Sequence, residues 1–133
     1  MFSISTKSRY GLRALMELAR EQKSEHLSLG ELASRQNISH KYLEAIFGML
    51  QKNGIVRSRR GPSGGYMLAK EPADITLLEI LHAVEGPLTI VDCLSHESIC
   101  KASETCPSRT VWKKLEDHIA GFLAEQTLDR MLA

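Results

Sequence analysis

Apolar residues recur at helical spacing near the start of the chain, on one face of a helix that we expect from about Thr6 to Gln22. Ser5 stands where an N-cap belongs, because its hydroxyl can accept a hydrogen bond from an otherwise unpaired backbone N–H. The residues on this apolar face are Tyr10, Ala14, Leu15, Leu18 and Ala19.

Two shorter helices are predicted next. The order Ser28-Leu29-Gly30-Glu31 matches a capping box, which marks the start of a helix. Ser39 caps a third helix, and Gly54 stands where a C-terminal glycine ends it. The apolar face of this third helix consists of Leu43, Ile46, Phe47 and Leu50.

A two-stranded hairpin is expected between this helix and the next. Ile55 and Val56 begin its first strand, a glycine-rich turn follows, and residues 66–68 return as the second strand. A fourth helix begins near Thr76 with a second capping box to Glu79, and Gly86 ends it.

The region from Leu88 to Pro107 has no convincing periodicity, although all three cysteines lie in it. Loops of this length are usually functional. A long helix is then expected from about Ser108 to Gln126, with an apolar stripe that one small domain cannot cover alone. A partner helix from a second copy is the natural cover. The stripe consists of Val111, Trp112, Leu115, Ile119, Phe122 and Leu123.

These elements predict a mainly α fold with a small β-hairpin: a winged helix-turn-helix followed by a long C-terminal dimerisation helix. We divide the chain into a DNA-binding domain (1–86), a cysteine loop (87–107), and the dimerisation helix with a C-terminal tail (108–133).

Composition excludes several classes of protein. The chain has 133 residues, of which 43% are hydrophobic and 25% charged, as in ordinary globular proteins. Neither a membrane span nor a signal-peptide core is evident, and an odd number of cysteines suits a reducing compartment. We therefore expect a cytoplasmic protein with no membrane partner. No nucleophile with its base, phosphate-binding loop or paired carboxylate motif indicates an enzyme.

The net charge of +1 hides an uneven distribution of charge along the chain. Residues 1–70 hold 12 Lys or Arg against 5 Asp or Glu, whereas residues 71–133 hold 5 against 11. The basic half is therefore a candidate to meet a polyanion. A chance distribution of solvated charges remains the alternative.

The third helix has the polar first turn that a recognition helix needs in the major groove. Glu44 is suited to accept from a cytosine amino group, and Lys41 or Tyr42 to reach phosphate or base. In the hairpin, glycines permit close approach and arginines suit phosphates or the minor groove. The candidate DNA-binding residues are Ser28, Ser39, His40, Lys41, Tyr42, Glu44, Arg57, Arg59, Arg60, Gly61, Pro62, Ser63, Gly64 and Gly65.

Several motifs resemble the Rrf2 family of bacterial transcriptional regulators. The likeness is carried by Ser39-His40-Lys41-Tyr42-Leu43-Glu44, by Arg60-Gly61-Pro62-Ser63-Gly64-Gly65-Tyr66, by Glu85-Gly86-Pro87, and by Thr110-Val111-Trp112. It implies a homodimer on a partly palindromic double-stranded DNA operator, with the long helix crossing to its partner. We expect a repressor. Ala45 departs from a member that carries a base-contacting glutamine there, which implies a different operator preference.

The cysteines are Cys93, Cys100 and Cys106, and thiolates are soft ligands for iron–sulfur clusters or zinc. Their spacing fits structural zinc poorly, while inert buried cysteines stay open as an alternative. The resemblance implies an iron–sulfur cluster, [2Fe-2S] or [4Fe-4S], that senses cluster status, redox state or nitric oxide, with cluster-donating proteins as further partners. Alternatives are a cluster-free thiol-sensing or partner-regulated repressor, and a winged-helix protein–protein adaptor.

The fourth ligand of such a cluster stays open. Arg109 stands where a cluster-bearing member of the family carries a histidine. A hydroxyl, a solvent molecule or a small thiol are candidates, together with four side chains of this chain. These four are Asp92, His96, Glu97 and His118.

Overall fold

Three capped helices open the fold, as the sequence predicts: α1 (Thr6–Arg20), α2 (Leu29–Gln36) and α3 (His40–Lys52). The computed structural model describes residues 3–21, 27–59, 65–95 and 105–133. Each predicted serine caps its helix by accepting from the backbone N–H three residues later, at 3.2 Å for Ser5, 3.1 Å for Ser28 and 3.1 Å for Ser39.

The turn between α2 and α3 is short because Asn37 adopts the left-handed conformation, with φ 54°. Its neighbour Ile38 then donates its backbone N–H to the carbonyl of Ala33 at 2.9 Å, which closes the end of α2. Ser39 follows at once as the cap of α3. The link between the two helices of the helix-turn-helix is thus short, and its backbone is held by hydrogen bonds.

Gly54 ends α3 in the same way, with φ 72°. Ile55 donates its N–H to the carbonyl of Leu50 at 3.0 Å, and the chain turns directly into β1 (Val56–Ser58). β1 pairs antiparallel with β2 (Tyr66–Leu68), Val56 opposite Leu68. This hairpin is the wing, and the N–H of Tyr66, at the end of β2 nearest the turn, donates to the carbonyl of Leu27 at 3.0 Å.

A short 3-10 helix, η1 (Pro72–Asp74), leads into α4 (Leu77–Glu85). Thr76 and Glu79 form the complete capping box that the sequence predicts. Lys70 also donates to Glu79. Burial raises the pKa of Glu79, but the hydrogen bonds from Lys70 and Thr76 outweigh it, so this pKa lies below its ordinary value.

The predicted long helix is present as α6 (Pro107–Glu125). Two short helices were not expected: α5 (Asp92–Ser95) within the cysteine loop and α7 (Leu128–Leu132) in the tail. The tail is anchored because Leu77 donates its N–H to the carbonyl of Gln126 at 2.8 Å, and Leu128 donates to that of Ile75 at 3.0 Å.

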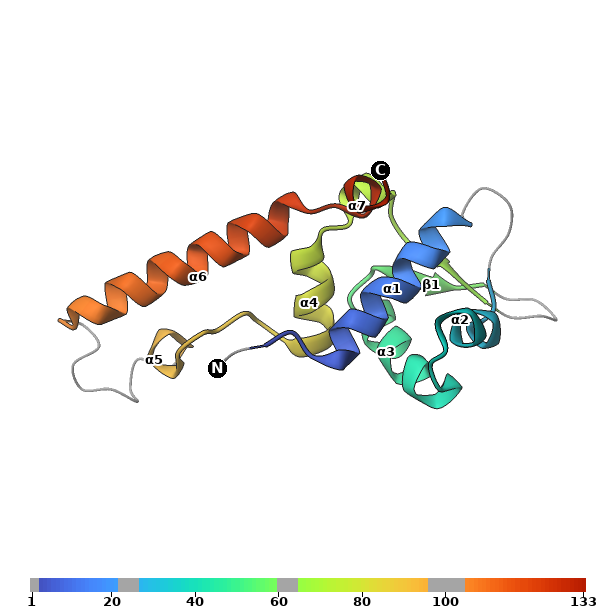
Figure 1. Ribbon diagram of the computed structural model, residues 1–133, viewed down its shortest axis with the longest axis horizontal. Helices are drawn as coiled ribbons and strands as arrows, with labels where there is room; N and C mark the ends of the chain where they lie inside the picture. Colours follow the sequence, from blue (N-terminus) through green and yellow to red (C-terminus); the bar gives the residue numbers. More distant parts are fainter. Residues whose placement is uncertain (1–2, 22–26, 60–64, 96–104) are drawn as a thin grey trace.

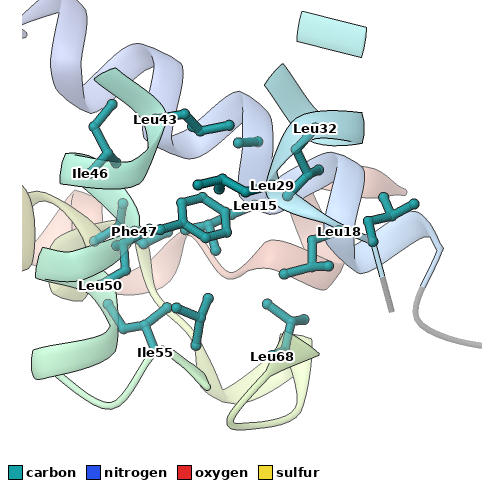
Figure 2. Packing of buried hydrophobic residues seen from close by; sticks show 14 of the residues in the cluster. Leu15, Leu18, Leu29, Leu32, Leu43, Ile46, Phe47, Leu50, Ile55 and Leu68 are labelled. Carbon is teal, nitrogen blue, oxygen red and sulfur yellow. The ribbon is translucent and has the colours of Figure 1, made fainter. Parts of the chain in front are cut away.

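The core lies where α1, α2, α3, α4, the wing and α7 meet, with Phe47 at its centre (Figure 2). Its burial follows from the predicted apolar face of α3, whose residues are all fully buried. Truncating such a phenylalanine costs about 3–5 kcal/mol. The other residues labelled around it in Figure 2 are Leu15, Leu18, Leu29, Leu32, Leu43, Ile46, Leu50, Ile55 and Leu68.

The elements are arranged as an elongated body with a projecting arm (Figure 1). α2 and α3 lie at one end together with the wing strands, and α6 extends away from the opposite side of α4. The mainly α fold with a two-stranded hairpin and a long C-terminal helix is therefore confirmed. Within the described ranges, no helix has the length and apolar character to cross a membrane.

Replacing Gly11 by valine should lower the free energy of unfolding by about 1–3 kcal/mol. A Cβ added at this buried position of α1 would lie 3.0 Å from Cγ2 of Ile46 in α3. The same substitution at Gly48, where nothing lies within 4 Å of the added Cβ, should change it by less than about 0.5 kcal/mol. Urea denaturation of both variants measures the difference; equal losses would contradict this account of the α1–α3 contact.

Candidate nucleic-acid interface and cysteine site

The first turn of α3 presents polar side chains outward. Ser39 is the cap, and His40, Lys41 and Glu44 that follow are all exposed. Nδ1 of His40 lies 4.0 Å from Oε2 of Glu44, with both side chains more than half exposed. Because an exposed pair of this kind contributes little, both groups stay available to a ligand.

Tyr42 differs from its neighbours because its side chain is half-buried. Its ring packs edge-on against Tyr10 of α1, with the ring centroids 6.0 Å apart. Among the predicted DNA-binding residues on α3, it is therefore the one that also holds the helix in place.

Ser28 and Ser39 both use their hydroxyl oxygens as helix caps. A hydroxyl that accepts a backbone hydrogen bond still has its own hydrogen to donate. Both residues are therefore structural, and both keep one polar contact for a ligand.

The wing carries exposed cations next to α3. Arg57 and Arg59 are exposed, and the N–H of Arg59 donates to the carbonyl of Gly65 at 2.9 Å. Gly65 has φ 147°, a conformation that favours glycine. Predicted site residues that lie outside the described ranges are Arg60, Gly61, Pro62, Ser63 and Gly64.

An aromatic contact fixes the wing relative to α3. The ring of Tyr66 in β2 packs edge-on against Phe47 of α3, with a centroid distance of 5.0 Å and an interplanar angle of 83°. The structure thus brings the basic wing and the polar turn of α3 to one end of the molecule (Figure 1). A polar helix beside a basic hairpin is the arrangement that enters a DNA groove and grips its phosphates.

Sequence reasoning missed Arg13 of α1 as a contributor to this end of the molecule. Its guanidinium donates to Gln36, which is 23 residues away in the chain. The spacing of apolar residues and the capping motifs describe local structure, so they do not predict a polar contact between residues this far apart in the chain.

The cysteine site lies at the other end of the molecule, where α5 meets α6. Cys93 belongs to α5 and Cys106 is the N-cap residue of α6, and both are partly exposed. Arg109 Nε donates to the carbonyl of Cys93 at 3.5 Å, which ties the two elements together. The third predicted ligand, Cys100, lies outside the described ranges.

Cys106 has the environment of a reactive thiol. Its Sγ lies 2.9 Å from Oγ of Ser108. This hydrogen bond, the backbone N–H groups of Arg109 and Ser108 and the nearby guanidinium lower the pKa of Cys106 below its ordinary value, because they all stabilise the thiolate. Thiolates are the form that binds soft metals.

Cys93 and Cys106 are partly exposed thiols on adjoining elements, and Cys106 lies next to the backbone N–H groups at the N-terminus of α6, so their chemistry is that of the soft donors an iron–sulfur group requires. Within the described part of the chain, no group of three His, Cys, Asp or Glu side chains is gathered to hold a metal ion. Of the candidate fourth ligands, His118 is exposed on α6, and His96 and Glu97 lie outside the described ranges.

Exposed apolar side chains are spread along α6. Val111 is 58% exposed and Phe122 62%. A cavity of about 270 Å³ opens between α4 and α6, and it is lined partly by Leu81 and Ile119. Of the predicted stripe, Leu123 alone is buried, at 7% exposed.

Fold and site together define a winged helix-turn-helix transcriptional regulator. The chain matches the Rrf2 family, described as an iron-dependent transcriptional regulator, over residues 4–133. The chain therefore belongs to the Rrf2 family, and the resemblance seen in its motifs is confirmed. It is a transcriptional regulator and not an enzyme.

Similar proteins include both IscR and CymR regulators. The HTH-type transcriptional regulator IscR of Photorhabdus laumondii is 34% identical over 129 residues, which cover 97% of this chain and 78% of that protein. The structure of CymR, the global cysteine regulator of B. subtilis, is 35% identical with a TM-score of 0.81, covering 99% and 97% of the two chains. That of T. potens IscR is 35% identical with a TM-score of 0.78, covering 98% and 86%.

Replacing Ser108 by alanine should move the pH midpoint for alkylation of Cys106 to a higher value, because the thiolate loses its largest stabilising hydrogen bond. Iodoacetamide labelling of reduced, metal-free protein across a pH series, read by peptide mass spectrometry, gives this midpoint. Thr110→Ala removes a hydroxyl from the same turn and serves as the control. An unchanged midpoint for Ser108→Ala would contradict the assignment.

Proposed function

We propose that the chain is a homodimeric repressor that binds a partly palindromic operator, and that its cysteine segment holds an iron–sulfur cluster as the sensor. The observation that carries the proposal is the exposed polar first turn of α3 beside the basic wing. In this proposal residues 1–86 bind DNA, residues 87–107 bind the cluster, and residues 108–133 form the dimer contact and tail.

For DNA, α3 enters the major groove with Lys41 and Glu44 toward base edges or phosphates, and the wing arginines grip the adjacent backbone. The exposure of these side chains supports this arrangement. The full set proposed for DNA contact is Ser28, Ser39, His40, Lys41, Tyr42, Glu44, Arg57, Arg59, Arg60, Gly61, Pro62, Ser63, Gly64 and Gly65.

For dimerisation, α6 pairs with α6 of a second copy. The exposed Val111, Trp112, Leu115 and Phe122 support this, because contiguous apolar surface of this kind marks an interaction site. A two-fold dimer then presents two copies of α3, as a partly palindromic operator requires.

For sensing, Cys93, Cys100 and Cys106 are the proposed thiolate ligands of the cluster. When bound, an iron–sulfur cluster supplies a redox-responsive centre in a protein. The chain's own contribution is to hold two of these thiols at the junction of α5 and α6, with Arg109 bridging the elements. Reorganisation of this junction acts on the N-terminal end of α6.

The C-terminal end of α6 is fixed differently. It is tied to the start of α4 by the backbone hydrogen bonds of Leu77 and Leu128. A displacement at the cysteine end therefore changes how α6 leaves the winged domain, and in the dimer it changes the spacing of the two recognition helices.

Cluster-free thiol sensing is the second candidate. It is supported by the lowered pKa of Cys106, which favours reversible oxidation, and by the similarity to CymR. Both candidates use an accessible thiolate. They are distinguished by whether the protein binds iron and sulfide.

Replacing Arg59 by methionine should reduce the slope of log K against log salt concentration by about 1.8 for the homodimer, because one phosphate contact worth about 0.9 is lost in each protomer. The duplex used is the best-bound sequence selected from a random pool, with affinity measured by fluorescence anisotropy. Lys113→Met removes the same charge from α6, at the opposite end of the molecule, and should leave the slope unchanged (Figure 1). Equal slopes for wild type and both variants, or binding that ignores sequence, would favour the protein–protein adaptor instead.

Protein purified without oxygen should contain iron and acid-labile sulfide at about two or four atoms of each per chain. Replacing Cys106 by serine should abolish both, whereas Thr110→Ser, which changes an exposed residue of the same helix and leaves every cysteine and Ser108 in place, should retain them. If iron and sulfide are absent even after reconstitution, while peroxide still alters DNA affinity through Cys106, the thiol-sensing candidate replaces the cluster.

A further inference from the structure

A cluster of side chains joins α1 to the link between α2 and α3. Arg13 donates from Nε to Oε1 of Gln36 at 3.2 Å, and from its terminal nitrogen Nη2 to the backbone carbonyl of Gln36, also at 3.2 Å. The guanidinium carbon lies 5.4 Å from the centroid of the Tyr10 ring. Arg13 therefore contacts both a helix end and an aromatic ring.

The carbonyl of Gln36 is one of the last in α2, where carbonyl groups lack partners within the helix and carry the negative end of its dipole. A guanidinium suits this place because it is always charged and its planar fork donates two hydrogen bonds in a fixed geometry. Lysine, with its single rotatable ammonium, cannot reproduce this arrangement.

The same cluster reaches α3 through aromatic packing. Arg13 lies over Tyr10, and Tyr10 packs edge-on against Tyr42 in the first turn of α3. Only Asn37, Ile38 and Ser39 separate the end of α2 from the start of α3. Arg13 thus holds both sides of the link, at the end of α2 and, through Tyr10, at the start of α3.

We propose that Arg13 is a positioning residue for the recognition helix: it fixes α3 relative to α1 and does not itself contact DNA. The inference rests on the proposed function, because it assumes that α3 reads the operator. An exposed arginine in the basic half of the chain would otherwise be counted as a phosphate contact, and the two roles differ in what their loss changes.

The test compares Arg13→Met and Arg13→Lys with wild type on two duplexes, the sequence selected from a random pool and a scrambled version of it. Both variants should reduce the ratio of specific to scrambled affinity by about tenfold, within the range by which residues that do not touch a ligand modulate its binding. The salt slope on the scrambled duplex should stay at the wild-type value, because no phosphate contact is lost.

Arg9→Met is the matched control. Arg9 lies on the same helix, is exposed, and donates to Thr6 within the first turn of α1. Its replacement removes the same charge, and it should leave the affinity ratio unchanged. Glu44→Ala, a residue proposed to read a base, is the positive control and should reduce the ratio.

A second measurement does not depend on DNA. Hydrogen exchange of the Asn37 and Ile38 backbone N–H groups, which close the end of α2, should accelerate in both Arg13 variants and not in Arg9→Met. If wild type shows no sequence preference, the proposed function fails while this measurement still tests the Arg13 contact.

Two results would overturn the positioning role. A salt slope reduced by about 1.8 for the homodimer, about 0.9 for each protomer, in Arg13→Met but retained in Arg13→Lys would identify a phosphate contact. Unchanged exchange at Asn37 and Ile38, in variants that thermal denaturation finds folded, would show that Arg13 does not hold the link.

Discussion

Burial of one face of α3 is the constraint on which the rest of the structure depends. Leu43, Ile46, Phe47 and Leu50 are all fully buried, so the rotation of α3 about its own axis is fixed. The side chains on the opposite face of α3, which include Lys41 and Glu44, therefore face outward. The packing of Tyr66 against Phe47 then fixes the wing to the same core, so a single apolar cluster orients both parts of the proposed DNA interface.

The chain buries the apolar face of α3 within its own core, but it leaves much of the apolar face of α6 exposed. α6 contacts α4, but its outer face keeps Val111 and Phe122 more than half exposed to solvent. Exposing such side chains is unfavourable in water, at about 25 cal/mol per Å² of apolar surface. In the proposed homodimer a second copy of the chain would remove that cost for both protomers at once, since a two-fold axis uses the same surface twice.

The parts of the fold that the sequence predicts are those set by local chemistry. Ser39 and Gly54 bound α3, and Thr76 with Glu79 starts α4, because each acts on backbone groups a few residues away. The anchoring of α7 beside η1 could not be predicted, since it pairs Thr127 with Thr76 across the chain. The half-burial of Tyr42 was missed for the same reason, because its partner Tyr10 lies on another helix.

The separation between the cysteines and α3 limits how a signal can act. Cys93 and Cys106 lie where α5 meets α6, and α3 lies on the far side of α4 (Figure 1). The core between them is closely packed, and such cores shift between discrete arrangements instead of deforming continuously. α6 is different, because it is anchored to the winged domain mainly through α4 and the hydrogen bonds around Ile75. A sensor at the cysteine end would therefore act by changing the separation of the two intact winged domains in the proposed dimer. The contacts that each winged domain makes with DNA would stay unaltered.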